Sequence, residues 1–105
     1  MRRKEKLIKM TEYGKRIEEI NICTALVEKY GDKQINICIE EMSELTKELC
    51  KNVRGYNNLD NIYEEMADVF IMLAQMQILF QMDVKVLDNI IYQKAKRAKE
   101  RLLDN

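Results

Sequence analysis

Apolar residues recur every three or four positions along most of this chain, a spacing that predicts α-helices. Four segments carry the pattern: from residue 11 or 12 to 29, 33–53, from 59 or 60 to 81, and 84–103. Residues 1–10 form either an additional helix or a loose basic arm. The apolar stripes are Ile17, Ile20, Cys23 or Thr24, and Val27; Ile35, Cys38, Met42, Leu45 and Leu49; Ile62, Met66, Val69, Leu73, Met76 and Phe80; and Val84, Leu87, Ile91, Ala95, Ala98 and Leu102.

The connections between these segments are short and have typical helix-ending residues. Gly31 is suited to a helix C-cap, and Asp32 directly after it to an N-cap. Residues 54–58 contain a glycine and two asparagines, which indicates a loop. Asp83 is the expected N-cap of the last helix. Short connections favour antiparallel neighbours.

The third segment is apolar on more than half of its circumference, because Phe70 and Leu79 widen its stripe. Such a helix needs more cover than three partners in a small monomer provide. We therefore predict an all-α fold of four main antiparallel helices, forming a bundle that is completed by oligomerisation. The alternative is a monomeric four-helix bundle.

Composition narrows the class of protein. The 105 residues suffice for one domain, without proline and with three glycines. Eighteen basic residues balance 18 acidic ones, so no net charge draws the chain to a nucleic acid polymer. Without histidine, a Cys–His catalytic pair and the common His-containing zinc sites are excluded. Cys23, Cys38 and Cys50 lie among aliphatic residues, which indicates reduced thiols in a cytoplasmic protein.

Membrane insertion and secretion are not expected. The longest apolar stretch, residues 69–80, is too short to cross a bilayer and includes two glutamines. The basic start of the chain lacks the apolar core of a signal peptide.

Two similar acidic motifs, IEEMSEL at 39–45 and YEEMADV at 63–69, lie on the second and third helical segments. At about 100° per residue, Glu41 and Glu44 fall on one shoulder of the apolar stripe. Glu65 and Asp68 fall on the same shoulder of the third segment. If the two helices pack antiparallel through their apolar faces, the four carboxylates converge.

Converging carboxylates repel one another unless a cation neutralises them. Without histidine or thiolate ligands, Mg²⁺ or Mn²⁺ suits this all-oxygen set. The chemistry implied is metal-assisted hydrolysis of a phosphoric anhydride. Glu40 and Glu64 face away and either support the site from behind or are ordinary surface acids. A solvated acidic face is the alternative for all of them.

The acidic pattern resembles a known family. Glu-x-x-Glu at 41–44, followed after 20 residues by Glu-x-x-Asp at 65–68, is similar to the signature of the MazG-like all-α nucleoside triphosphate pyrophosphohydrolases. This superfamily includes dimeric dUTPases, dCTP pyrophosphatases and phosphoribosyl-ATP pyrophosphohydrolase. The stretches YGDKQINICIEEMSELTKEL and YEEMADVFIML look like its two acidic helices. YQKAKRAKERL resembles the basic tail of its short bacterial and phage members.

The resemblance implies an activity and a set of ligands. Glu41, Glu44, Glu65 and Asp68 would hold Mg²⁺ and carry catalysis. The reaction would be hydrolysis of an NTP or dNTP between its α and β phosphates, giving the monophosphate and pyrophosphate. Family members assemble as dimers or as dimers of dimers.

Substrate phosphates require positive charge, and Lys94, Arg97 and Arg101 share one face of the fourth segment. They are the candidate phosphate-binding residues; the alternative is that they complement the helix dipole. Base recognition stays open, because Met72 stands where some members of the family present an aromatic residue.

Two other functions compete with this one. The chain could be a non-catalytic helical module for oligomerisation or nucleotide-binding regulation. It could also belong to the phosphoribosyl-ATP pyrophosphohydrolase branch.

Overall fold

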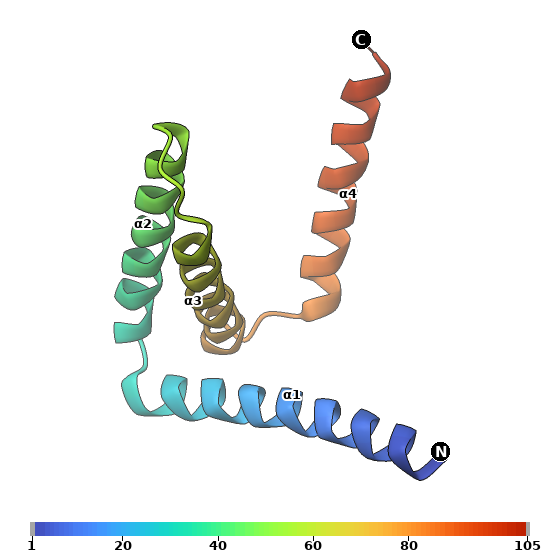
Figure 1. Ribbon diagram of the computed structural model, residues 1–105. Coiled ribbons are helices and arrows are strands. Elements are labelled where there is room, and N and C mark those ends of the chain that lie inside the picture. The colour runs from blue at the N-terminus through green and yellow to red at the C-terminus, as the bar shows by residue number, and fades with distance from the viewer. Residues whose placement is uncertain (1, 105) are drawn as a thin grey trace.

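The computed structural model describes the backbone of residues 2–104 and the side chains of residues 14–104. It contains four α-helices (Figure 1) and, in the described residues, no strand. The predicted all-α class is confirmed. The helices are α1 (Arg2–Tyr30), α2 (Lys33–Val53), α3 (Leu59–Leu79) and α4 (Val84–Leu103).

Two helix ends differ from the prediction. Helix α1 begins at Arg2, so residues 2–10 are neither a loose arm nor a separate helix; Met1 lies outside the described residues. No proline separates this stretch from the rest of α1. Helix α3 ends at Leu79, two residues early, because Gln81 adopts a left-handed φ of 50° and turns the chain.

The predicted caps are partly confirmed. Gly31 has a positive φ of 55°, and its N–H donates to the carbonyl of Val27 at 2.8 Å. The Asp83 carboxylate accepts from the backbone N–H of Lys85 at 2.9 Å, as an N-cap should. Asp32 precedes α2 as predicted, but its side chain makes no capping hydrogen bond, because its own backbone is already helical (φ −60°, ψ −19°).

Helices α2 and α3 form an antiparallel pair, and α1 crosses one end of it (Figure 1). Helix α4 stands apart and, among the residues that the structure describes, makes no extensive packing contact with the other helices. The radius of gyration is 17.9 Å, whereas a compact chain of this length has about 13 Å. A single chain is therefore more extended than a compact domain of the same length.

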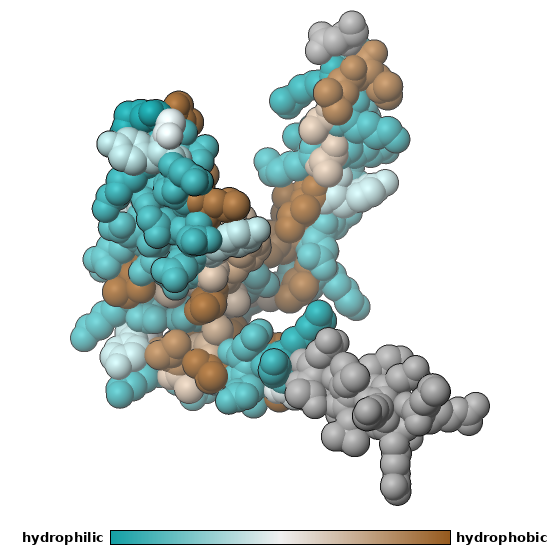
Figure 2. Space-filling view, in the orientation of Figure 1, coloured by the Kyte–Doolittle hydropathy of each residue, from teal (hydrophilic) through white to brown (hydrophobic). Residues whose placement is uncertain are grey.

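The prediction that the α4 stripe faces inward is wrong within one chain. Val84, Ile91 and Leu102 are exposed, Ala95 and Ala98 are exposed too, and only Leu87 is half-buried. The physical reason is that, in the described part of the chain, no other helix packs extensively against α4. Apolar side chains accordingly line its visible face in Figure 2.

The buried centre of the chain is small and partly polar. Cys23 from α1, Cys38 from α2 and Met72 from α3 are its buried apolar residues. Between α2 and α3, the buried Gln34 amide donates through Nε2 to Oε1 of buried Gln75 at 2.7 Å. This buried hydrogen bond ties the start of α2 to the end of α3.

Candidate metal centre

The pairing of α2 with α3 is set by polar side chains at intervals of seven residues. Gln34 on α2 bonds to Gln75 on α3. Fourteen residues further along α2 and fourteen back along α3, Glu48 Oε1 accepts from Asn61 Nδ2 at 3.1 Å. Midway between these two pairs, the same register places Glu41 opposite Asp68. The hydrogen bonds at the two ends thus position the acids between them.

Three of the four predicted carboxylates meet. Oxygen atoms of Glu41, Glu65 and Asp68 all lie within 4.8 Å of one another. Glu41 and Glu65 are half-buried, and Asp68 is exposed. The prediction that the acidic shoulders of the second and third helices converge is therefore confirmed in geometry for these three residues.

Electrostatics at this cluster reflect crowding of like charges. Desolvation, followed by the negative charges of Asp68 and Glu65, raises the pKa of Glu41 above its ordinary value. Desolvation, followed by the charges of Asp68 and Glu44, raises the pKa of Glu65. Both carboxyls hold a proton more tightly than free glutamate does, so the cluster favours the binding of a positive charge.

The fourth predicted ligand, Glu44, lies at the edge of the cluster. Its carboxylate is turned toward Lys47, whose Nζ is 3.7 Å away, and about half of its side chain is exposed. It is nevertheless close enough to Glu65 for its charge to act on that carboxyl. Glu40 and Glu64 are exposed on the outer faces of their helices. Of these two, Glu64 adds the smallest of the charges that raise the pKa of Glu65.

The predicted phosphate-binding residues are not brought to the cluster within one chain. Lys94, Arg97 and Arg101 are exposed along α4, which stands away from the α2–α3 pair (Figure 1). A helical wheel shows which side chains share one face of a helix. It does not show which other helix that face contacts.

Sequence reasoning missed Glu48, Asn61 and Gln75 as parts of this arrangement. Glu48 and Gln75 are 5% and 1% exposed, although both residue types usually lie at the surface. A signal was present: Glu48 follows Glu41 by seven residues, and Asn61 precedes Asp68 by seven.

Two kinds of residue bear on base recognition: tyrosines, whose rings can stack on a base, and Met72. Tyr30, Tyr56 and Tyr63 are exposed. Lys29 lies over the ring of Tyr30 and Arg54 over that of Tyr56. Met72 is 5% exposed, so this side chain belongs to the core.

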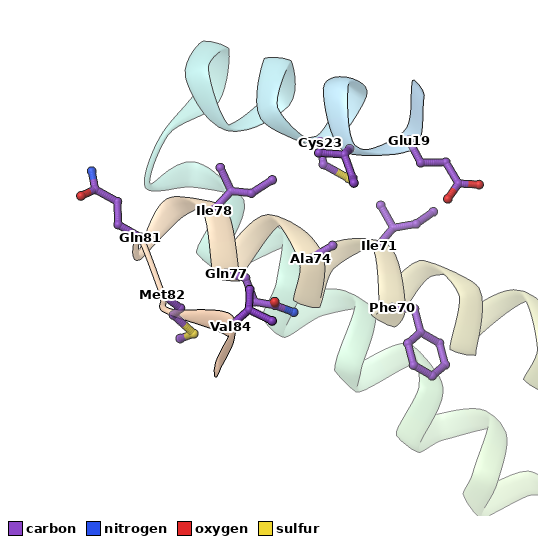
Figure 3. Close-up of a pocket in the computed structure, with 11 residues that line it drawn as sticks. Glu19, Cys23, Phe70, Ile71, Ala74, Gln77, Ile78, Gln81, Met82 and Val84 are labelled. Carbon is purple, nitrogen blue, oxygen red and sulfur yellow. The ribbon is translucent and has the colours of Figure 1, made fainter. Parts of the chain in front are cut away.

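An apolar groove of about 560 Å³ lies away from the acids, between α1, α3 and the α3–α4 connection. Figure 3 shows Cys23 of α1 facing Ile71 and Ala74 of α3, with Met82 and Val84 at the other end. Desolvation, followed by the charge of Glu19, raises the pKa of the Cys23 thiol. The groove is suited to apolar packing rather than to phosphate chemistry.

Comparison with known proteins finds no matching family model, no matching curated protein and no matching solved structure. None of the helices in the described part of the chain combines the length and apolar character needed to cross a membrane.

Proposed function

We propose that this protein is a Mg²⁺-dependent nucleotide pyrophosphohydrolase, in which Mn²⁺ can replace Mg²⁺. It cleaves NTPs or dNTPs between the α and β phosphates. The observation that carries the proposal is the meeting of Glu41, Glu65 and Asp68, from two helices, within 4.8 Å. The resemblance of the acidic motifs to MazG-like enzymes supplies the reaction.

The donor set fits a small divalent cation. Mg²⁺ binds oxygen at 2.0–2.1 Å, so opposite ligands are about 4.2 Å apart. Adjacent octahedral ligands are about 3 Å apart, and at most two of three ligands can lie opposite each other. The three carboxylates, now within 4.8 Å of one another, would therefore move inward by up to roughly 2 Å. Glu44 joins them if its side chain turns away from Lys47. Bound Mg²⁺ would neutralise the carboxylates and polarise the phosphate and the attacking water.

The residues of the chain have separate tasks in this reaction. The carboxylates orient the attacking water at the α phosphorus, and one of them accepts its proton. The water oxygen bonds to the α phosphorus as the bond to the α–β bridging oxygen breaks, and pyrophosphate leaves with the electron pair. Positive side chains must balance the charge on the leaving group.

We propose that the cations of α4 do this in an assembly. Lys94, Arg97 and Arg101 each directly precede a stripe residue of α4, as each of the four acids directly precedes one on its own helix. If the exposed α4 stripe packs against an α2–α3 pair, the cations lie on the shoulder of that interface.

The uncovered apolar surface supports a homodimer or a dimer of dimers as the functional form. Phe70 of α3 and Phe80, which directly follows α3, are 65% and 56% exposed, and most of the α4 stripe is exposed as well. Association would bury this surface, which disfavours an isolated monomer. We infer a cytoplasmic protein that acts on a free nucleotide.

The test is a panel of NTPs and dNTPs with Mg²⁺, in which release of pyrophosphate and monophosphate is measured. The wild type is expected to hydrolyse at least one of them. Glu41→Gln and Asp68→Asn should lose turnover while they keep the helical circular dichroism spectrum. Glu28→Gln makes the same carboxylate-to-amide change on an exposed position of α1 and should keep full activity.

The proposal fails if the wild type releases nothing from any nucleotide and Mg²⁺ does not raise its unfolding temperature. Nucleotide binding without turnover would instead identify a regulatory module. Turnover of phosphoribosyl-ATP alone would place the chain in that branch.

A further inference from the structure

A polar hollow of about 420 Å³ lies at the start of α3, directly after the turn that connects it to α2. Its walls come from one short stretch of chain and carry, with one exception, amide or carboxyl groups: Asn57, Asn58, Leu59, Asp60 and Asn61. In contrast to the apolar groove beside α1, this hollow suits a ligand that forms hydrogen bonds.

The buried carboxylate of Glu48 fixes the orientation of one wall residue, Asn61. Glu48 is 5% exposed, and its Oε1 accepts from Asn61 Nδ2 at 3.1 Å. An ionised carboxylate only accepts hydrogen bonds, so the Asn61 amide turns its N–H₂ group toward Glu48 and its carbonyl Oδ1 away. In the described part of the chain no group donates to this Oδ1, and Asn61 is exposed. The hollow therefore has a fixed, unoccupied acceptor.

The other polar wall residues divide into a structural one and free ones. Asn58 donates through Nδ2 to the backbone carbonyl of Glu48 at 2.8 Å, and its Oδ1 accepts from Asn52 Nδ2 at 3.3 Å. The Asp60 carboxylate is exposed and has no hydrogen bond or ion pair within the described residues. Asn57 is exposed too, and its amide can donate or accept. A held framework thus presents a second free acceptor, the carboxylate of Asp60, beside that of Asn61.

The hollow lies on the side of α3 that carries the acids. Asn61, Glu65 and Asp68 follow one another at spacings of four and three residues, so they share one helix face. From Asn61 the helix rises about 6 Å to Glu65 and about 10.5 Å to Asp68. A nucleotide whose α phosphate lies at the acids can therefore reach the hollow with its base, because the ribose spans the distance between them.

We propose that the hollow at residues 57–61 receives the base of the substrate and selects cytosine and adenine, which carry an exocyclic amino group. The amino N–H groups donate to Asn61 Oδ1 and to the Asp60 carboxylate. Uracil, thymine and hypoxanthine present a keto oxygen at the same place, which would face two acceptors and leave them unpaired. This inference rests on the proposed function and adds to it the class of nucleotide.

The experiment compares kcat/KM for two matched pairs of substrates, CTP with UTP and ATP with ITP, by release of pyrophosphate in Mg²⁺. Within each pair only an amino group is exchanged for a keto oxygen. The wild type is expected to favour the amino nucleotide at least about fivefold in one pair or both. Asp60→Asn replaces an acceptor by an amide that can also donate, so it should reduce this ratio at least about twofold. Asp32→Asn makes the same change before α2, where the side chain makes no capping hydrogen bond, and should keep the ratio.

Glu48→Gln provides a second test, which addresses the orientation of Asn61. A glutamine can donate as well as accept, so the Asn61 amide is free to turn over and present its N–H₂ group to the hollow. The ratio of amino to keto nucleotide should then fall at least about twofold. A loss of folded enzyme would lower kcat/KM for both members of a pair equally and would leave the ratio unchanged.

The inference is overturned if the wild type favours the amino nucleotide less than about fivefold in both pairs, or prefers a keto nucleotide in either. It is also overturned if Asp60→Asn or Glu48→Gln keeps the ratio within about twofold, or if Asp32→Asn changes it as much as they do. In all of these cases hydrolysis still occurs, and the proposed function stands without this inference. If no nucleotide is hydrolysed, both fail.

Discussion

Replacing Gln75 by leucine tests whether the buried amide pair holds α2 against α3. Gln75 is 1% exposed and Gln34 is 8% exposed, and each is the only hydrogen-bond partner found for the other's side chain in the described residues. Gln75→Leu conserves most of the volume but leaves the Gln34 amide buried without its acceptor. An orphaned buried polar group costs about 1–3 kcal/mol. At this chain length, that corresponds to a fall of at least about 4 °C in the unfolding temperature.

The double variant Gln34→Leu/Gln75→Leu separates this effect from a loss of packing. With both amides removed no polar group is orphaned, so the double variant should be less destabilised than the two single variants combined. The assay is urea unfolding at one fixed chain concentration, since association would otherwise shift the midpoint. Gln93→Leu, on an exposed position of α4, is the control. Additivity of the two single changes within about 0.5 kcal/mol would refute the reasoning.

The remaining predictions concern the acids, a turn and the thiols. The pKa values of Glu41 and Glu65 are higher in the folded chain than in the unfolded one, so protonation of these carboxyls favours the folded state. This contribution to the free energy of unfolding is fully present below about pH 4.5 and is lost as the pH rises through the folded-state pKa values. In EDTA the free energy of unfolding should therefore fall from pH 4.5 to 7, less steeply in Glu41→Gln; equal slopes would contradict this. Gln81 has a left-handed φ of 50° directly after α3, a conformation that costs less for glycine. Gln81→Gly should therefore raise the free energy of unfolding, measured with urea, by about 1 kcal/mol. A lower free energy of unfolding would show that the Gln81 side chain contributes more stability than its backbone strain removes. Exposed Cys50 should react with a thiol reagent well before buried Cys23, whose thiol pKa is raised; equal rates would contradict the burial.

The periodicity of the chain was sufficient to predict the four helices and the convergence of the acids. Helical spacing places Glu41 and Glu65 on matching shoulders, and the short turn at residues 54–58 forces α2 and α3 to run antiparallel. Those two facts predict that Glu41, Glu65 and Asp68 converge, and the Gln34–Gln75 and Glu48–Asn61 hydrogen bonds fix the register in which they meet. Local patterns determine neighbours when the connection is this short.

What the sequence did not reveal depends on contacts between helices. Glu48 reads as a surface residue on α2, and its burial becomes visible only when Asn61 is placed opposite it. The Glu44 carboxylate points toward Lys47 rather than into the acidic cluster, and the helical pattern alone does not decide between these two orientations. The α4 stripe was expected to face inward but is exposed within one chain, because an apolar stripe does not specify which helix it meets.

The central claim is that the carboxylates of α2 and α3 direct water to the α phosphorus of a nucleotide. Hydrolysis of the best substrate in water labelled with oxygen-18, with Mg²⁺, tests it most directly by mass spectrometry of the products. We predict label in the nucleoside monophosphate and none in the pyrophosphate, with no labelled product from Glu41→Gln. Label in pyrophosphate or in free phosphate, or the same labelling by Glu41→Gln, would contradict the account.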